Sequence, residues 1–201
     1  MNNTSVATIH EDLNHSIGGG FTSQGLVEIY GDEGAGKTAT AISLSHYAEV
    51  GYIDLDGTFP HQLEHIVGRS DQLLLCQLTP DVSVENLSEM VEAMCSNLPV
   101  VVIDPLGCLE WEKVEALGPI LSRMSKQYNC LIVLVNHANA FNESPNERIT
   151  SFYCKQRVQV QKTEANEKGM QIEFRVTKNL LYPPFKYGTI DIQFQEEELL
   201  R

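Results

Sequence analysis

The eight residues between Gly31 and Thr38 have the types and spacing of a phosphate-binding turn. They fit the pattern G-x-x-x-x-G-K-[ST], between a predicted strand, Leu26–Tyr30, and a predicted helix. Glycines allow backbone N–H groups to converge on phosphates, and the helix start adds its dipole. We expect Lys37 to reach the β- and γ-phosphates of ATP and Thr38 to bind Mg²⁺; the alternative is a chance glycine-rich turn. The expected nucleotide-binding residues are Gly31, Asp32, Glu33, Gly34, Ala35, Gly36, Lys37 and Thr38.

Asp104 is the expected second anchor for Mg²⁺. It follows four β-branched residues, Val100–Ile103, which predict a strand covered on both faces. A carboxylate at the end of such a strand can hold Mg²⁺ beside a bound nucleotide. The alternative is an ordinary solvated aspartate at a strand end.

Two further pairs of polar residues end predicted strands and suggest hydrolysis. Asp54 and Asp56 end the strand after the turn, where one of them could orient an attacking water as general base. Asn136 and His137 end the strand Leu131–Val135, where they could sense a γ-phosphate and relay its presence into the next loop. Ordinary strand-end polar residues are an equal alternative for both pairs.

His61, Glu64 and His65 fit the motif H-x-x-E-H of one class of zinc protease. Two histidines four residues apart can share a helix face and bind zinc. No well-placed third ligand is evident, and the segment lies inside the nucleotide-binding unit. We therefore expect no zinc, and interpret the segment as an exposed helix start.

The elements that must position these residues alternate between strands and helices. This alternation predicts an α/β fold with a mostly parallel central sheet flanked by helices. The predicted strands are 26–30, 52–55, 73–76, 100–103 and 131–135, and the predicted helices cover 37–48, 84–94 and 114–124.

The pattern changes after His137. The polar segment Ala138–Thr150 predicts a loop, and Arg157–Lys162 and Ile172–Val176 alternate as the strands of an antiparallel β-hairpin. Ile190–Phe194 predicts a last strand. We expect one domain over residues 1–201, with a short lead-in, a core over about 17–194 and a tail over 195–201.

Charge is distributed unevenly along the chain. The net charge is −13; residues 1–120 carry 3 basic and 18 acidic side chains, whereas residues 148–186 carry 8 basic and 3 acidic ones. The total argues against a protein that coats nucleic acid by charge alone, but the basic segment could face a polyanion. A solvated hairpin is the alternative.

Five widely spaced cysteines without a C-x-x-C pair indicate core thiols in a reducing compartment. No apolar run reaches the length of a membrane span, and no signal peptide opens the sequence. We expect an intracellular protein with no membrane partner, cytoplasmic if it is prokaryotic or viral.

The chain resembles the ATPase core of the RecA/RadA recombinases. The resembling segments occur in family order from about residue 17 to 194 and cover nearly the whole chain. They are Ile17–Gly20, Gly25–Gly31, Tyr52–Phe59, Val100–Asp104, Val135–His137, Ser151–Tyr153, Arg157-Val158, Arg175–Asn179 and Pro184–Lys186. The resemblance implies a RecA-like P-loop fold with a C-terminal hairpin, the cofactors ATP and Mg²⁺, and an ATPase acting on single-stranded DNA in recombination or repair.

The resemblance also implies roles for individual residues. Asp56, Lys37 and His137 would be catalytic, and Lys178 would reach the nucleotide of a neighbouring subunit. ATP would order the loop Ala138–Thr150, so that the loop and the basic hairpin contact DNA. The candidate DNA contacts are Phe141, Arg148, Lys155 and Arg157, although an ordinary loop aromatic is the favoured interpretation of Phe141. Self-association or a recombinase partner is expected.

Four departures from the family pattern leave other functions open. The catalytic acid is Asp56 rather than glutamate, the strand-end sensor is His137 rather than glutamine, and Leu180 replaces a second lysine. The first DNA-binding loop is reduced to about Pro105–Trp111. One alternative is a paralogue that binds ATP, scarcely hydrolyses it and serves as an accessory subunit. Another, which His137 favours, is a related ring-type regulatory ATPase.

Overall fold

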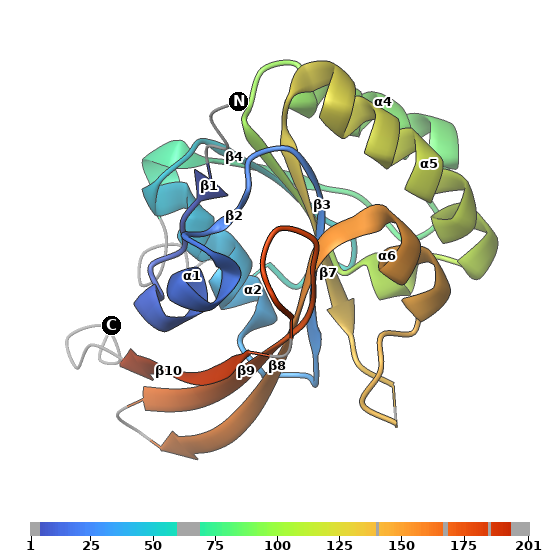
Figure 1. Cartoon of the computed structure of the whole chain (residues 1–201). Coiled ribbons are helices and arrows are strands. Elements are labelled where there is room, and N and C mark those ends of the chain that lie inside the picture. The colour runs from blue at the N-terminus through green and yellow to red at the C-terminus, as the bar shows by residue number, and fades with distance from the viewer. Residues whose placement is uncertain (1–4, 60–68, 140, 167–168, 185, 194–201) are drawn as a thin grey trace, which may run out of the picture.

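The computed structural model of the chain describes residues 5–59, 69–139, 141–166, 169–184 and 186–193. Eight strands form its central sheet (Figure 1). In chain order they are β3 (Gly25–Gly31), β4 (Val50–Asp54), β5 (Leu73–Gln77), β6 (Val100–Asp104), β7 (Leu131–His137), β8 (Cys154–Asn166), β9 (Gly169–Asn179) and β10 (Tyr187–Gln193). A separate two-stranded sheet joins β1 (Ser5–Val6) to β2 (Phe21–Thr22).

The strand order of the large sheet is β10-β9-β8-β3-β7-β6-β4-β5. The strands from β8 to β5 pair in parallel, whereas β9 and β10 add in antiparallel fashion. This arrangement confirms the predicted mostly parallel sheet with a C-terminal antiparallel hairpin. Because β3, β4, β6 and β7 run parallel, their carboxyl ends share one edge, which is where the candidate chemistry lies.

Helices cover both faces of the sheet, as predicted (Figure 1). Alternate strand residues feed two hydrophobic cores: Val27 and Val102 face one, and Leu26 and Ile103 face the other. The first core is closed by α1 (Glu11–Ile17) and α2 (Lys37–Ile42). The second is closed by α4 (Val84–Cys95), α5 (Trp111–Tyr128) and α6 (Glu147–Tyr153).

The structure corrects three expectations. The helix expected over residues 37–48 ends at Ile42 and continues as a 3₁₀ turn, Ser43–His46. The end of the expected loop Ala138–Thr150 is helical, because α6 begins at Glu147 and buries Ile149 and Thr150. The helix α1 was not predicted at all.

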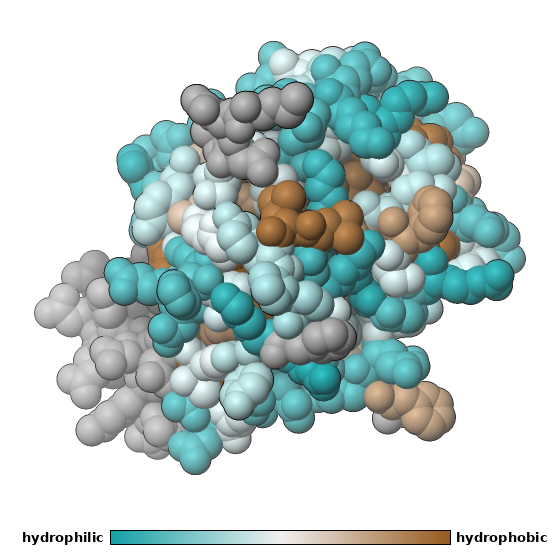
Figure 2. Space-filling view, viewed as in Figure 1, coloured by the Kyte–Doolittle hydropathy of each residue, from teal (hydrophilic) through white to brown (hydrophobic). Residues whose placement is uncertain are grey.

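Most of the visible surface is polar (Figure 2). One apolar patch lies over the connection between β9 and β10, where Leu180 is 64% exposed and Leu181 and Tyr182 are about half exposed. All five cysteines are free thiols. Within the described residues, no helix is both long enough and apolar enough to cross a membrane.

Candidate functional site

The turn between β3 and α2 is built around three glycines. Gly34 and Gly36 have φ angles of 69° and 83°, in the left-handed region that glycine adopts at least cost. Gly31 is required for a different reason: a Cβ there would lie 1.9 Å from the carbonyl oxygen of Val160 on β8. The neighbouring strand therefore passes too close to the turn for any side chain at position 31.

Lys37 is buried at the start of α2, and its ammonium turns back onto the turn itself. Its Nζ donates to the carbonyl oxygens of Gly31 at 3.0 Å and Asp32 at 2.6 Å. Burial lowers the pKa of Lys37, although Asp104, Asp32 and Glu33 oppose that shift by their negative charge. The ammonium of Lys37 is partly desolvated and is now bonded to neutral carbonyls. A bound phosphate would offer it negatively charged oxygens instead, which accept stronger hydrogen bonds.

Thr38, in the first turn of α2, contacts Asp104 at the carboxyl end of β6. The Thr38 hydroxyl donates to Oδ2 of Asp104 at 2.7 Å, and the hydroxyl of Tyr52 donates to the same oxygen. Burial raises the pKa of Asp104, despite the opposing effects of the bonds from Tyr52 and Thr38 and of the nearby Lys37. Tyr52 was missed by sequence reasoning; the only available signal was its position two residues before Asp54 on an adjacent strand.

The donor set at this junction fits Mg²⁺. A hydroxyl and a carboxylate are hard oxygen ligands, and Mg²⁺ commonly takes only one or two of them from protein beside substrate phosphates and water. In the parts of the chain that the structure describes, no group of three or more His, Cys, Asp or Glu side chains is placed to hold a metal. His61, Glu64 and His65, the residues of the zinc motif, lie outside the described residues.

The two aspartates after the turn differ in environment. Asp54 is buried and accepts hydrogen bonds from the amides of Gly57 and Phe59 and from the side chain of Gln77. Burial would raise the pKa of Asp54, but these bonds together lower it. Asp54 therefore organises the loop that carries Asp56. Asp56 is exposed, and its Oδ1 accepts from the amide and hydroxyl of Thr58.

Asn136 and His137 also separate. His137 is exposed and lies opposite Gly31 in the register of β7 with β3, beside the turn. Asn136 is wholly buried, and its amide donates to Glu28 and Ser144. Only His137 of the expected sensor pair is thus accessible at the sheet edge.

The four candidate DNA contacts divide into two groups. Phe141 is 83% exposed at the tip of the loop after β7, and Arg148 is exposed on α6. Lys155 instead donates to the carbonyl of Gln24 at 2.7 Å, and burial, with the nearby Lys126, lowers its pKa.

Arg157 is the clearest departure from the sequence-based interpretation. It is 4% exposed, and it donates to Glu28 at 2.6 Å and forms a two-pronged pair with Glu147. Burial lowers its pKa, but Glu147 and Glu28 raise it to a net value above that of a free guanidinium. This guanidinium is enclosed by its own carboxylates, so it is not a surface cation for DNA phosphates.

Lys178, the expected contact to a neighbouring nucleotide, is half-buried. Its Nζ donates to the carbonyl of Ser151 on α6 at 2.6 Å, and burial lowers its pKa. The ammonium of Lys178 is thus already engaged by one hydrogen bond within its own chain.

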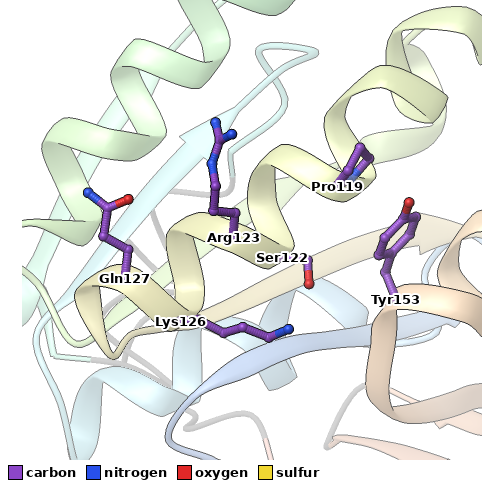
Figure 3. A pocket seen from close by; sticks show the side chains of 6 residues that line it. All are labelled: Pro119, Ser122, Arg123, Lys126, Gln127 and Tyr153. Atoms are coloured by element: carbon purple, nitrogen blue, oxygen red, sulfur yellow. The ribbon is translucent and has the colours of Figure 1, made fainter.

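An open groove of about 500 Å³ lies between α5 and the end of α6 (Figure 3). It is lined by Pro119, Ser122, Arg123, Lys126, Gln127 and Tyr153. Tyr153 is the one lining residue that α6 contributes, and the others all lie on α5.

Comparison with curated proteins finds RecA proteins. The chain is 28% identical to RecA of Lactiplantibacillus pentosus over 235 aligned positions, which cover 95% of this chain and 61% of the relative. It is 26% identical to RecA of Clostridium beijerinckii, covering 97% of this chain and 64% of the relative. These similarities indicate a distant relationship between this chain and RecA proteins.

The chain spans only 61% to 64% of the length of these curated relatives. RecA of Enterococcus faecalis is similar at 28% identity, with 90% of this chain and 64% of the relative aligned. No protein-family model matches the chain. In these three comparisons the aligned part is 90% or more of this chain.

Proposed function

We propose that this RecA-like chain binds ATP with Mg²⁺ at Gly31–Thr38, hydrolyses it slowly, and acts on single-stranded DNA in recombination or repair. The observation that carries the proposal is the contact between Thr38 and Asp104. The Thr38 hydroxyl lies 2.7 Å from Oδ2 of Asp104, beside the buried side chain of Lys37. A hydroxyl, a carboxylate and a lysine at the mouth of a glycine turn form the set of groups that nucleotide phosphates and Mg²⁺ require.

Each residue has a defined task in this proposal. Lys37 exchanges the carbonyls of Gly31 and Asp32 for phosphate oxygens. Thr38 and Asp104 would hold Mg²⁺, which neutralises phosphate charge when bound. Asp56 is exposed and would orient a water, and His137 lies beside Gly31, where it would respond to the phosphates.

The test is steady-state ATP hydrolysis with and without single-stranded DNA, together with fluorescent-nucleotide binding. Lys37→Ala should abolish both signals, whereas Lys113→Ala, on α5, should leave them unchanged. DNA-stimulated turnover that disappears in Lys37→Ala supports the proposal. An unchanged rate in Lys37→Ala would refute it.

A second candidate is an accessory subunit that binds ATP but scarcely hydrolyses it. Two observations favour it: the exposed Leu180 and Leu181 form an apolar patch suited to a partner protein, and Lys178 is already bonded within the chain. Nucleotide binding without turnover above the Lys37→Ala blank, together with saturable binding to a recombinase, would select this candidate.

A further inference from the structure

A wholly buried carboxylate, Glu28, lies three residues before the nucleotide-binding turn, and the proposed chemistry does not use it. It is on β3, on the same face as Leu26, and is 0% exposed. A buried charge is costly unless it is paired and hydrogen-bonded, and an apolar residue would fill the same space at lower cost. The hydrogen-bond partners of Glu28 must therefore offset the cost of burying its charge.

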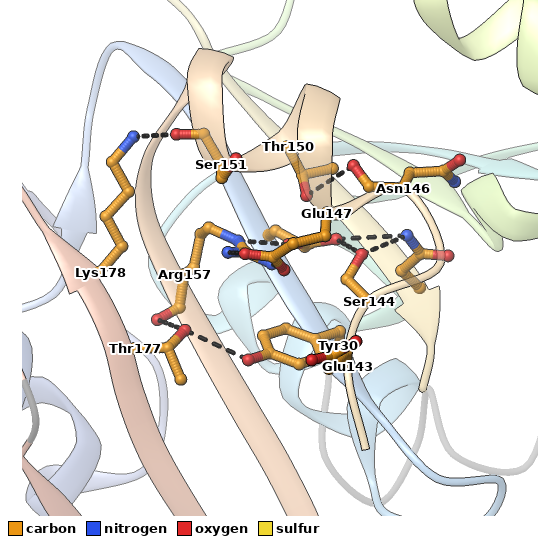
Figure 4. A network of polar contacts seen from close by, with 12 residues as sticks. Tyr30, Glu143, Ser144, Asn146, Glu147, Thr150, Ser151, Arg157, Thr177 and Lys178 are labelled. Carbon is orange, nitrogen blue, oxygen red and sulfur yellow. Dashed lines mark hydrogen bonds and ion pairs between the residues drawn. The ribbon is translucent and has the colours of Figure 1, made fainter. Parts of the chain in front are cut away.

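The two oxygens of Glu28 hold two different segments. Ser144 and Glu147 of these segments lie close to Arg157 in Figure 4. Oε1 accepts from the Ser144 hydroxyl at 2.6 Å and from the Asn136 amide at 3.2 Å. Oε2 accepts from Nε of Arg157 at 2.6 Å, and Arg157 in turn binds Glu147, the first residue of α6. One oxygen thus fixes the end of the loop after β7, and the other fixes the helix that follows it.

The same loop is tied to β3 at its other end. The amide of Ala138 donates to the carbonyl of Gly31 at 2.8 Å, and this carbonyl also accepts from Lys37. Between the two ties, Asn139 closes the tip by accepting from the amides of Phe141 and Glu143. The exposed Phe141 is therefore carried on a loop whose two ends are fastened to the strand that enters the turn.

We propose that Glu28 is the positioning residue of this loop: it fixes Ser144 and α6 to β3, so that a change at the turn Gly31–Thr38 is transmitted to the tip at Phe141. The transmission to nucleotide rests on the proposed function. The anchoring of the loop by Glu28 does not, and it can be measured on the chain without nucleotide.

Ser144→Ala is the most informative variant, because it removes one tie and leaves the buried pair of Glu28 and Arg157 intact. The matched control is Ser96→Ala, an exposed serine at the end of α4. Without nucleotide, amide hydrogen exchange over residues 138–147 should be about tenfold faster in Ser144→Ala, since a hydrogen bond to a charged group is lost. Equal exchange in Ser144→Ala and Ser96→Ala would overturn the proposal.

Transmission is measured with a tryptophan at the loop tip. In a Trp111→Phe, Phe141→Trp background, adding ATP and Mg²⁺ should change the tryptophan emission, and Ser144→Ala should remove at least about half of that change. Nucleotide affinity, measured with a fluorescent analogue, should stay within about threefold because Ser144 does not touch the turn. An unaltered emission change in Ser144→Ala would overturn the transmission.

The failure of the proposed function gives a different result. If the parent chain binds no nucleotide but Ser144→Ala still accelerates exchange over residues 138–147, the anchoring role of Glu28 is supported and ATP binding is refuted.

Discussion

Gly31→Ala should damage the candidate site through a backbone collision rather than through an altered backbone angle. The added Cβ would lie 1.9 Å from the carbonyl oxygen of Val160, whereas ordinary contact begins at 3.4 Å. The two strands must therefore separate by about 1.5 Å, the difference between these distances. Overpacking of this kind costs about 1–3 kcal/mol, and each lost backbone hydrogen bond adds about 1 kcal/mol. We expect the free energy of unfolding to fall by about 2–4 kcal/mol.

Gly34→Ala is the matched control within the same turn. Its φ of 69° strains an alanine, but no atom lies within 4 Å of the added Cβ, so only about 1–2 kcal/mol should be lost. Urea denaturation followed by circular dichroism measures the free energy of unfolding of both variants. If Gly31→Ala is no less stable than Gly34→Ala, the close approach of β8 to the turn does not exist in solution and the reasoning fails.

Three more predictions concern protonation, magnesium and DNA. Burial lowers the pKa of His10 to about 4, so the folded chain binds fewer protons than the unfolded chain below pH 6.5. The free energy of unfolding should therefore fall by about 2 kcal/mol between pH 7.5 and pH 5. In urea titrations, His10→Gln should remove this loss. Tyr52→Phe removes a donor that fixes Asp104, and should raise the Mg²⁺ concentration for half-maximal nucleotide binding about tenfold in fluorescence titrations. Arg148→Ala should weaken single-stranded DNA binding and reduce the slope of log affinity against log salt by about one in anisotropy titrations, whereas Lys155→Ala should change the slope little.

Each of these predictions has a contradicting outcome. The same loss of stability in His10→Gln as in the parent chain would assign the pH dependence to another group. An unchanged Mg²⁺ requirement in Tyr52→Phe would mean that Asp104 does not need this hydroxyl. If Lys155→Ala changes the slope of log affinity against log salt more than Arg148→Ala does, Lys155 rather than Arg148 contacts the DNA phosphates.

The sequence predicts the sheet well because its central strands are short runs of β-branched and apolar residues that have few alternatives. Val100–Ile103 is covered on both faces, and the structure buries all of β6. The turn Gly31–Thr38 is also recognisable, because its spacing encodes its backbone. By contrast, the sequence does not predict α6, because the helix follows a polar segment and only two of its residues are buried.

The environment of single charges could not be predicted in the same way. The charge count places Arg157 in a basic segment, but one of its partners, Glu28, is 129 positions earlier in the chain. Charge counts along a segment do not show which side chains face inward. Tyr52 presents the same difficulty, since its role depends on a carboxylate 52 positions away.

The shared carbonyl of Gly31, which accepts from both Lys37 and Ala138, has a thermodynamic consequence. If phosphate draws Lys37 away from this oxygen and thereby alters the loop, linkage requires the effect to run equally in the opposite direction. A molecule that binds the loop tip must then change the affinity for nucleotide by the same factor as nucleotide changes the affinity for that molecule. A tenfold effect measured at one end corresponds to about 1.4 kcal/mol of coupling free energy at both.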